Sequence, residues 1–343
     1  MRHVNIPIFI PHLGCPNTCV FCNQRTISGT TAFDIASVRE RIEEVLKTSD
    51  EDDECEIAFF GGSFTGIDFS LMVSLLEIAN EYVISGRVKT VRCSTRPDYI
   101  NDEILNTLKK YSVSVIELGL QSVSPRVLSE TRRGHGFEDE IRATSLIKQY
   151  GFRLGGQMMI GLPGSTVEDE VETAEFIVRS GCDVARIYPT IVFRDTELCN
   201  MSLSGSYDPL NVEDAVERSY RAFRILVDGG VRVIRIGLCD SENLHSDLTY
   251  FAGPNHPAIG EMVINRYYLE KIKEGISKFS TSNEKRIRVY VPRGHMSKAV
   301  GQNKRNRRIL AGLFGDLEIG FSEASELSEY RVLLEKDGKK ICI

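Results

Sequence analysis

Short apolar segments alternate with longer amphipathic segments over residues 5–237, and this alternation constrains the fold more than any other feature of the chain. Short apolar runs predict strands, and longer segments with apolar residues three or four apart predict helices. A regular strand–helix order is typical of parallel α/β sheets. The predicted strands are 6–11, 56–60, 90–94, 113–120, 153–160, 183–188 and 231–236.

The segments between these strands predict amphipathic helices, several of which begin after a Ser, Asn or Thr that suits a helix cap. They are 37–47, 70–84, 101–111, 166–180 and 213–228. About six strand–helix units predict an α/β fold, an incomplete (β/α)6 barrel of the TIM type. Parallel barrels carry their chemistry in the loops after the carboxyl ends of the strands, so functional residues are expected there.

The pattern changes after about residue 240. A loop and a helix at 260–279 are followed by the order strand, helix, helix, strand, which predicts a small α+β domain. Residues 285–308 contain nine Lys or Arg and no Asp or Glu. We therefore predict a barrel over 1–240, a helical connection over 241–280 and a small basic domain over 281–343.

Composition narrows the class of protein. The 42 basic and 48 acidic residues give a net charge of −6, which argues against a general polyanion binder. The chain has no apolar span of about 20 residues and no secretory cleavage pattern. Three of the nine cysteines lie within eight residues and the others are single, unlike a disulfide framework. These features predict a soluble, cytoplasmic protein without membrane association.

Cys15, Cys19 and Cys22 follow the first predicted strand with the spacing C-x3-C-x2-C. Three thiolates on one short loop suit iron–sulfur ligation, and three ligands leave one iron of a [4Fe–4S] cluster open to a further group. Two alternatives stay open. Zinc would need a fourth ligand, for which His12 is the nearest candidate, and the paired C-x2-C knuckles of structural zinc sites are missing. The other alternative is three buried cysteines without a metal.

This cysteine loop, with Phe21 before its last cysteine, resembles that of the radical S-adenosylmethionine (SAM) superfamily. The resemblance implies a [4Fe–4S] cluster on Cys15, Cys19 and Cys22, with SAM bound to the fourth iron. It also implies that an electron from the cluster cleaves SAM to methionine and a 5′-deoxyadenosyl radical. A partner that donates electrons, such as flavodoxin or ferredoxin, is expected.

Further motifs resemble SAM-contacting elements of the same superfamily. Gly61, Gly62 and Ser63 follow the second strand, where bare backbone can approach a ligand, although a double glycine alone is more often a turn. Gln121 and Arg133 resemble residues of the Elongator catalytic subunit and of oxygen-independent coproporphyrinogen oxidases that contact the ribose and the carboxylate of SAM. In isolation the two are more often a strand-end residue and a surface charge.

Two later strand ends continue the resemblance. Gln157 and Gly161 resemble the segment that lies against the adenosine of SAM, and Tyr188 is expected beside the adenine. Ser94 departs from the pattern, because the Elongator subunit has a SAM-associated glutamate there. Each motif alone is an ordinary strand and turn. Together they occur in order at successive strand ends, which is more specific.

The basic C-terminal segment resembles a KH domain, in which a G-x-x-G loop between two helices clamps the nucleic-acid backbone. In this chain lysine replaces the second glycine of that loop. The alternative is a solvated basic helix that closes the barrel, because charge runs usually face solvent. The resemblance implies RNA contacts by Lys298, Gly301, Gln302, Asn303, Lys304, Arg305 and Arg308.

Three functions follow from these observations. The Elongator-like core and the KH-like segment favour a radical SAM enzyme that modifies RNA, with transfer RNA as its partner. The segment around Gln121 and Arg133 favours instead a radical SAM enzyme on a small molecule such as a tetrapyrrole. The third function is that of a non-catalytic iron–sulfur protein that binds RNA.

Overall fold

The computed structural model describes residues 3–10, 14–15, 19–23, 33–50, 52–238, 246–279, 285–315 and 317–343. The candidate zinc ligand His12 and the predicted domain limits near 240 and 281 lie outside these residues.

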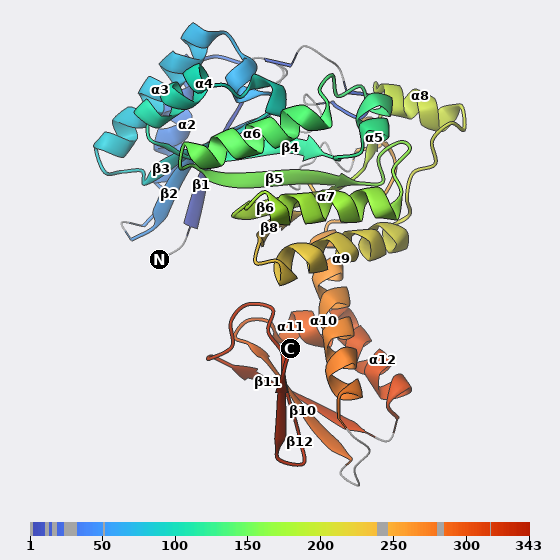
Figure 1. The fold of residues 1–343 in the computed structure, drawn as a ribbon. Helices are drawn as coiled ribbons and strands as arrows, with labels where there is room; N and C mark the ends of the chain where they lie inside the picture. The colour runs from blue at the N-terminus through green and yellow to red at the C-terminus, as the bar shows by residue number, and fades with distance from the viewer. Residues whose placement is uncertain are drawn as a thin grey trace.

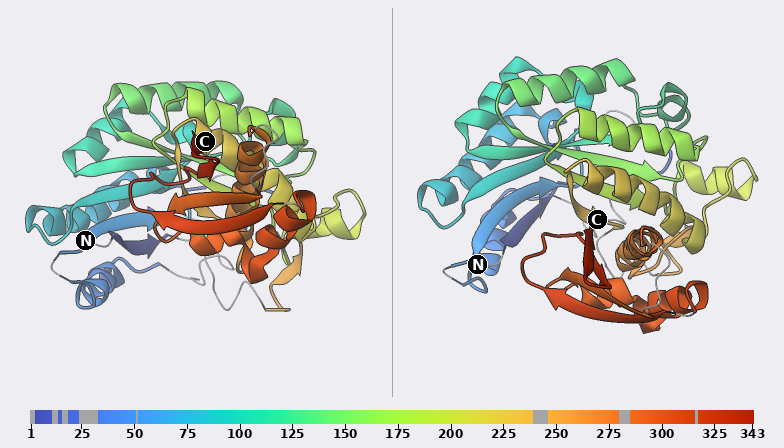
Figure 2. Two further views of the ribbon diagram at one scale, coloured as in Figure 1. Left: turned by 90° about the horizontal axis from the view of Figure 1, so that it is seen from below. Right: turned by 60° about the horizontal axis from the view of Figure 1, so that its bottom comes forward.

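Seven parallel strands form one sheet in the order β1-β2-β3-β4-β5-β6-β8, and the sheet curls into an incomplete barrel (Figures 1 and 2). This confirms the predicted fold class. The first strand begins three residues before its predicted start, and every other strand end lies within two residues of its predicted position. The strands are β1 (His3–Phe9), β2 (Glu54–Phe60), β3 (Thr90–Thr95), β4 (Val113–Gln121), β5 (Arg153–Ile160), β6 (Val184–Pro189) and β8 (Arg232–Ile236).

The longer helices that connect these strands cover the outer face of the sheet (Figure 1). The expected caps at Asn101 and Thr166 each accept a hydrogen bond from a backbone N–H of the first turn, and Asn211, which was not predicted as a cap, does the same. The helices are α2 (Ala36–Leu46), α3 (Phe69–Ile84), α4 (Asp102–Lys110), α5 (Pro125–Glu130), α6 (Phe137–Gln149), α7 (Val167–Arg179), α8 (Glu197–Leu203) and α9 (Val212–Asp228).

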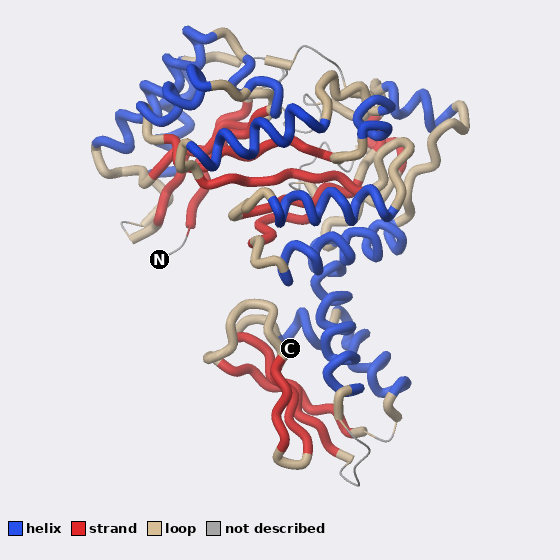
Figure 3. The backbone as a smooth tube through the Cα atoms, viewed as in Figure 1, coloured by secondary structure: helices blue, strands red, loops and turns tan. Residues whose placement is uncertain are grey.

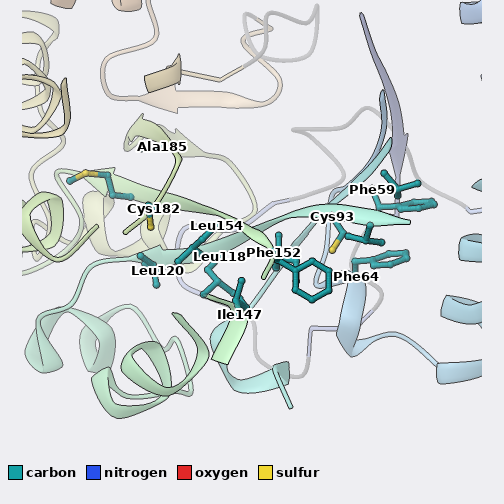
Figure 4. Packing of buried hydrophobic residues seen from close by; sticks show 14 of the residues in the cluster. Phe59, Phe64, Cys93, Leu118, Leu120, Ile147, Phe152, Leu154, Cys182 and Ala185 are labelled. Carbon is teal, nitrogen blue, oxygen red and sulfur yellow. The ribbon is translucent and has the colours of Figure 1, made fainter. Parts of the chain in front are cut away.

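The core lies between the sheet and these helices, where alternate residues of each strand point outward (Figure 4). Phe59 of β2 and Phe64 are stacked with their ring centroids 4.4 Å apart. Leu118 of β4 and Leu154 of β5 are fully buried in the same layer. Each such side chain contributes roughly 1.5–3 kcal/mol by leaving water. The outward residues therefore stabilise the fold, and the inward residues are left for other roles.

The C-terminal part has the expected order strand, helix, helix, strand: β10 (Arg286–Pro292), α11 (Met296–Val300), α12 (Arg305–Leu313) and β11 (Glu318–Ala324). A hairpin of β12 (Leu333–Lys336) and β13 (Lys339–Cys342) completes a sheet in the order β11-β10-β12-β13. Figure 3 shows the helices gathered on one side of this sheet.

The helix α10 (Ile259–Ser277) belongs to two hydrophobic cores. Val263 and Tyr267 pack in the barrel core, where the Tyr267 ring centroid lies 5.3 Å from that of Phe223 on α9. Ile272 and Ile276 pack in the core of the C-terminal sheet. A helix shared by two cores fixes one part to the other. No helix within the described ranges is long and apolar enough to span a bilayer.

Candidate active site at the carboxyl edge of the barrel

The cysteine loop is tied to two other loops at the carboxyl edge of the sheet. Val20 donates its backbone N–H to the Thr131 carbonyl at 3.2 Å, and its own carbonyl accepts from the Leu198 N–H at 2.8 Å. The segment around Cys19 and Cys22 therefore lies between the end of α5 and the start of α8. This is the edge at which the sequence predicted the chemistry.

Two glycines allow the cysteine loop to rest on the loop after β2. Gly14 has φ +77°, and a Cβ atom there would lie 2.4 Å from the Ser63 carbonyl oxygen. Gly61 has φ +104°, and its Cβ atom would lie 3.0 Å from the backbone nitrogen of Ile10. Only glycine fits such close backbone contacts at positive φ. The Gly61–Gly62 turn thus supports the cysteine loop directly.

The side chain of Ser63 is turned into the protein. Its Oγ lies 2.8 Å from the Thr95 Oγ1 and accepts the Arg96 backbone N–H at 3.3 Å. Any contact of this residue with a cofactor would therefore come from its backbone. That backbone also lowers the pKa of the Cys15 thiol through a hydrogen bond, but burial is the larger influence and leaves the pKa raised.

Two arginines bring positive charge to the cysteines. Arg133 donates from Nη1 to the Cys19 Sγ at 3.3 Å and from Nη2 to the Gly119 carbonyl at 2.5 Å. Arg96 and Arg133 are 4% and 6% exposed, and both act electrostatically on Cys15. Buried cations beside thiols stabilise thiolates, the form that ligates iron.

The donor set fits an iron–sulfur cluster chemically. Cys15 and Cys19 lie near enough to influence one another electrostatically, and the described cysteines are all free thiols. Across the residues whose positions are given, no three His, Cys, Asp or Glu side chains are gathered closely enough to hold a metal ion. The segment between the first two cysteines, 16–18, lies outside those residues.

Unpaired polar atoms beside the cysteines indicate room for a bound ligand. In the described parts of the chain, Gln121 Oε1 and Arg133 Nε are buried without a hydrogen-bond partner. Gln121 also has φ +69°, in the left-handed region that is strained for a residue with a side chain. Buried polar groups are normally paired. A ligand with a donor and an acceptor would satisfy both atoms.

A ladder of charges crosses the inner face of the barrel. Glu117 of β4 is 1% exposed and accepts from Arg92 of β3 at 2.8 Å and from Arg186 of β6 at 2.5 Å. Arg92 continues to Glu56 of β2 at 2.6 Å. Burial alone would raise the pKa of Glu117, but Arg186 and Arg92 outweigh it and hold the pKa below its ordinary value.

Gln157 of β5 joins this ladder. Its amide Nε2 donates to Glu117 Oε2 and to Ser94 Oγ, both at 3.1 Å. A carboxylate only accepts hydrogen bonds, so this amide nitrogen is fixed toward Glu117. The amide oxygen of Gln157 is then the atom left for a ligand. Sequence analysis missed the ladder, although inward positions of β2, β3, β4 and β6 carry Glu, Arg, Glu and Arg.

The remaining predicted SAM contacts are Gly161, Tyr188 and Phe21, and they lie in different surroundings. Gly161 has φ +76°, donates its N–H to Glu170 Oε1 at 2.6 Å and accepts from the Tyr207 hydroxyl at 2.7 Å. Both polar groups of its backbone are thus engaged within the protein. Tyr188 stands at the end of β6, and Phe21 packs against Val20 in a small apolar cluster near α8.

A second buried network, which sequence analysis also missed, lies behind Arg133. Arg96 pairs with Asp98 at 2.9 Å, and His135 Nε2 lies 3.3 Å from Glu140 Oε1. Burial, and next the charge of Arg133, lower the pKa of His135 to about 4. Burial raises the pKa of Glu140 well above its ordinary value. His135 is therefore neutral at pH 7, and burial favours the neutral form of Glu140.

A cleft of about 730 Å³ opens over two of the cysteines. Cys19 and Cys22 line it together with Arg132, Arg194 and residues at the start of α8. Arg132 and Asp195, both on the rim, have positive φ values of 53° and 59°. Strained residues of this kind gather at functional sites. The cleft is large enough for a small-molecule or nucleotide ligand.

The basic loop between α11 and α12 is exposed, and hydrogen bonds from a buried asparagine lie behind it. Asn303 and Lys304 have φ values of 50° and 61°, so the loop turns without a second glycine. Behind it the buried Asn306 donates to the carbonyls of Asn265 on α10 and of Ala299, at 2.7 and 3.1 Å. Of the predicted RNA contacts, Gln302, Asn303, Lys304, Arg305 and Arg308 are exposed, Lys298 is half-buried and Gly301 is buried.

Comparisons with known families agree with this geometry. The model of the Radical SAM superfamily matches residues 9–177, and that of the Radical_SAM C-terminal domain matches residues 182–269. The chain belongs to the radical SAM superfamily. It is a radical SAM enzyme, and the cofactors that this family uses are the [4Fe–4S] cluster and SAM.

Within the superfamily the chain is similar to Elongator-type proteins. It is 30% identical over 199 residues to a tRNA uridine(34) acetyltransferase of Methanocaldococcus infernus, a match that covers 52% of this chain and 37% of the relative. Human Elongator complex protein 3 is 28% identical, with 58% and 40% covered. The solved archaeal M. infernus Elp3 has a TM-score of 0.63 and 26% identity, over 79% of this chain and 63% of that one.

Proposed function

We propose that this enzyme modifies transfer RNA with a radical generated from SAM at the carboxyl edge of the barrel. One observation carries the proposal. The helix α10 connects the barrel, which has buried arginines beside its cysteines, to the part of the chain that carries the exposed basic loop. The relatives named for tRNA and Elongator support the same substrate class. Because the match covers 37% of the first relative, no acetyl transfer is carried over.

In this proposal Cys15, Cys19 and Cys22 hold the cluster. When bound and reduced by a donor such as flavodoxin or ferredoxin, the cofactors supply a 5′-deoxyadenosyl radical. Arg133 meets the SAM carboxylate through its unpaired Nε–H, because a guanidinium fork suits a carboxylate. Gln121 accepts a hydrogen bond from a ribose hydroxyl through Oε1, which is likewise unpaired among the described atoms.

The other cofactor contacts follow from the lining of the barrel. Gln157 accepts a hydrogen bond from SAM through its amide oxygen, because Glu117 fixes its amide nitrogen. Gly161 shapes the surface by the absence of a side chain, since a Cβ atom there would lie 2.6 Å from Leu210. The remaining contacts are the backbone of Gly61, Gly62 and Ser63 and the rings of Phe21 and Tyr188.

The basic loop contacts RNA phosphates in this proposal. Lys304 and Arg305 are exposed beside the loop that Asn265 and Asn306 hold in place. Salt weakens such contacts, because each neutralised phosphate releases counterions. The change of RNA affinity with salt concentration therefore reports the number of phosphate contacts more directly than the affinity at a single salt concentration.

The test compares transfer RNA binding by the cluster-loaded enzyme and a Lys304→Gln/Arg305→Gln variant over a range of salt concentrations. The slope of log affinity against log salt should fall by about 1 for each lost contact. The matched control is Arg142→Gln/Arg179→Gln, which removes the same charge from two exposed barrel helices. Equal slopes in both variants would remove the basic loop from the proposal, and no RNA retained at low salt would overturn the substrate class.

A further inference from the structure

The Arg133 guanidinium is shared between a predicted cluster ligand and the sheet. Nη1 donates to the Cys19 Sγ at 3.3 Å, while Nη2 donates to the carbonyl of Gly119, near the end of β4, at 2.5 Å. The side chain is buried, so solvent does not screen its charge. Two bonds from one planar group fix the direction of the N–H that points at the sulfur.

Arg96 holds the backbone of Arg133. Its Nη2 donates to the Arg133 carbonyl at 2.5 Å, and its own guanidinium is held by Asp98 at 2.9 and 3.0 Å. The backbone N–H of Arg96 donates to Ser63 Oγ at 3.3 Å. No hydrogen bond within the described residues joins Arg96 to a cysteine sulfur, so Arg96 acts on the Arg133–Cys19 hydrogen bond by holding Arg133, in addition to the electrostatic effect of its own charge on Cys15 and Cys19.

We propose that Arg133 raises the reduction potential of the cluster through its hydrogen bond to Cys19, and that Arg96 is the positioning residue that keeps it there. Reduction adds one electron and no proton, so the negative charge at the thiolates grows. A buried cationic donor stabilises that added charge, and hydrogen bonds to cluster sulfurs set such potentials. The inference rests on Cys19 as a ligand, which is part of the proposed function.

This role is compatible with a SAM carboxylate at the same arginine. A guanidinium has five N–H donors, of which one is used by Cys19 and one by Gly119. The Nε–H has no partner within the described atoms and lies on the same fixed plane. Arg133 can therefore donate to both a cluster ligand and a carboxylate without changing its position.

The first experiment measures the midpoint potential of the reconstituted enzyme without SAM, by anaerobic titration with titanium(III) citrate monitored by electron paramagnetic resonance. We expect a negative shift in Arg133→Gln, a smaller negative shift in Arg133→Lys, which keeps the charge but loses the fork, and a negative shift in Arg96→Gln. Arg126→Gln is the control, because Arg126 is an exposed arginine of α5 that pairs with Asp169. Its potential should equal that of the unaltered enzyme.

A second measurement is made first on the unaltered enzyme, so its main result does not depend on how the variants fold. The reduced cluster in protein labelled with 15N-arginine should show a nitrogen coupling by pulsed resonance, and Arg96→Gln should weaken it. The inference would be overturned if cluster-loaded Arg133→Gln kept the potential of the unaltered enzyme. It would also be overturned if the unaltered enzyme showed no nitrogen coupling. A cluster that has the coupling but never cleaves SAM would leave the inference intact and overturn the proposed function.

Discussion

The carboxyl edge of the barrel and the loop between α11 and α12 both concentrate positive charge, but in opposite ways. At the barrel edge Arg96 and Arg133 are buried, and each donates several hydrogen bonds within the protein. At the loop Lys304 and Arg305 are exposed, and the buried groups behind them are uncharged amides. Buried, fixed charge suits one small ligand of defined shape. Exposed charge on a rigid frame suits a polyanion that binds through many screened contacts.

The largest effect is expected from a substitution that breaks the charge ladder inside the barrel. Glu117→Gln leaves Arg186 and part of Arg92 buried without a carboxylate, and losing one partner of a buried ion pair costs about 3–5 kcal/mol. Urea unfolding of the cluster-free protein measures this loss. Glu175→Gln, which removes an exposed partner of Arg179, should change the unfolding free energy by less than about 0.5 kcal/mol. Similar losses in both variants would contradict the account of the ladder.

A smaller effect is expected when the frame behind the basic loop is broken. Asn306→Ala leaves the carbonyls of Asn265 and Ala299 without this donor, at a cost of roughly 1–3 kcal/mol. Amide hydrogen exchange over 301–306 should become faster, while exchange in the barrel strands stays unchanged. Asn106→Ala, at an exposed position of α4, is the matched control. Unaltered exchange over 301–306 would mean that the loop keeps its shape without the asparagine.

The smallest effect, taken for a change of one pH unit, is a dependence of stability on pH at Glu140. Its pKa is raised by burial above the ordinary 4.5, so its stabilising contribution is complete below that pH and is lost as pH rises through the folded-state pKa. Glu140→Gln removes this loss. The unfolding free energy of the variant, relative to that of the unaltered protein, should therefore rise by up to about 1.4 kcal/mol per pH unit. Thermal unfolding from pH 5 to pH 8 measures the difference. A gap that does not change with pH would show that Glu140 is charged in the folded protein.

Sequence predicted the parts that depend on local pattern. The period-two and helical patterns located the strands, most helices and even the short α11, because each element carries its own apolar signal. The predicted helices did not include α6, although Asp139 in its first turn accepts the backbone N–H of Gly136 at 3.1 Å. Sequence motifs also placed the cysteines, Gln121 and Arg133 at one edge, since parallel strands end there together.

The buried networks of charged side chains could be found only from the three-dimensional structure. Arg92, Glu117 and Arg186 are far apart in the chain, and only the register of β3, β4, β5 and β6 brings them into contact. A charge within an apolar strand was the available signal. Arg96 and His135 lie in different loops, so no spacing within the sequence indicated that they meet behind Arg133. The cofactor contacts of individual side chains therefore stay predictions.

The measurement that tests the central claim most directly is the yield of 5′-deoxyadenosine from the anaerobically reconstituted enzyme with SAM and dithionite. It is made with and without transfer RNA, and with Cys19→Ala as the control. The account predicts 5′-deoxyadenosine from the unaltered enzyme, more of it with transfer RNA, and none above background from Cys19→Ala. A fully loaded enzyme that releases no 5′-deoxyadenosine would contradict the account.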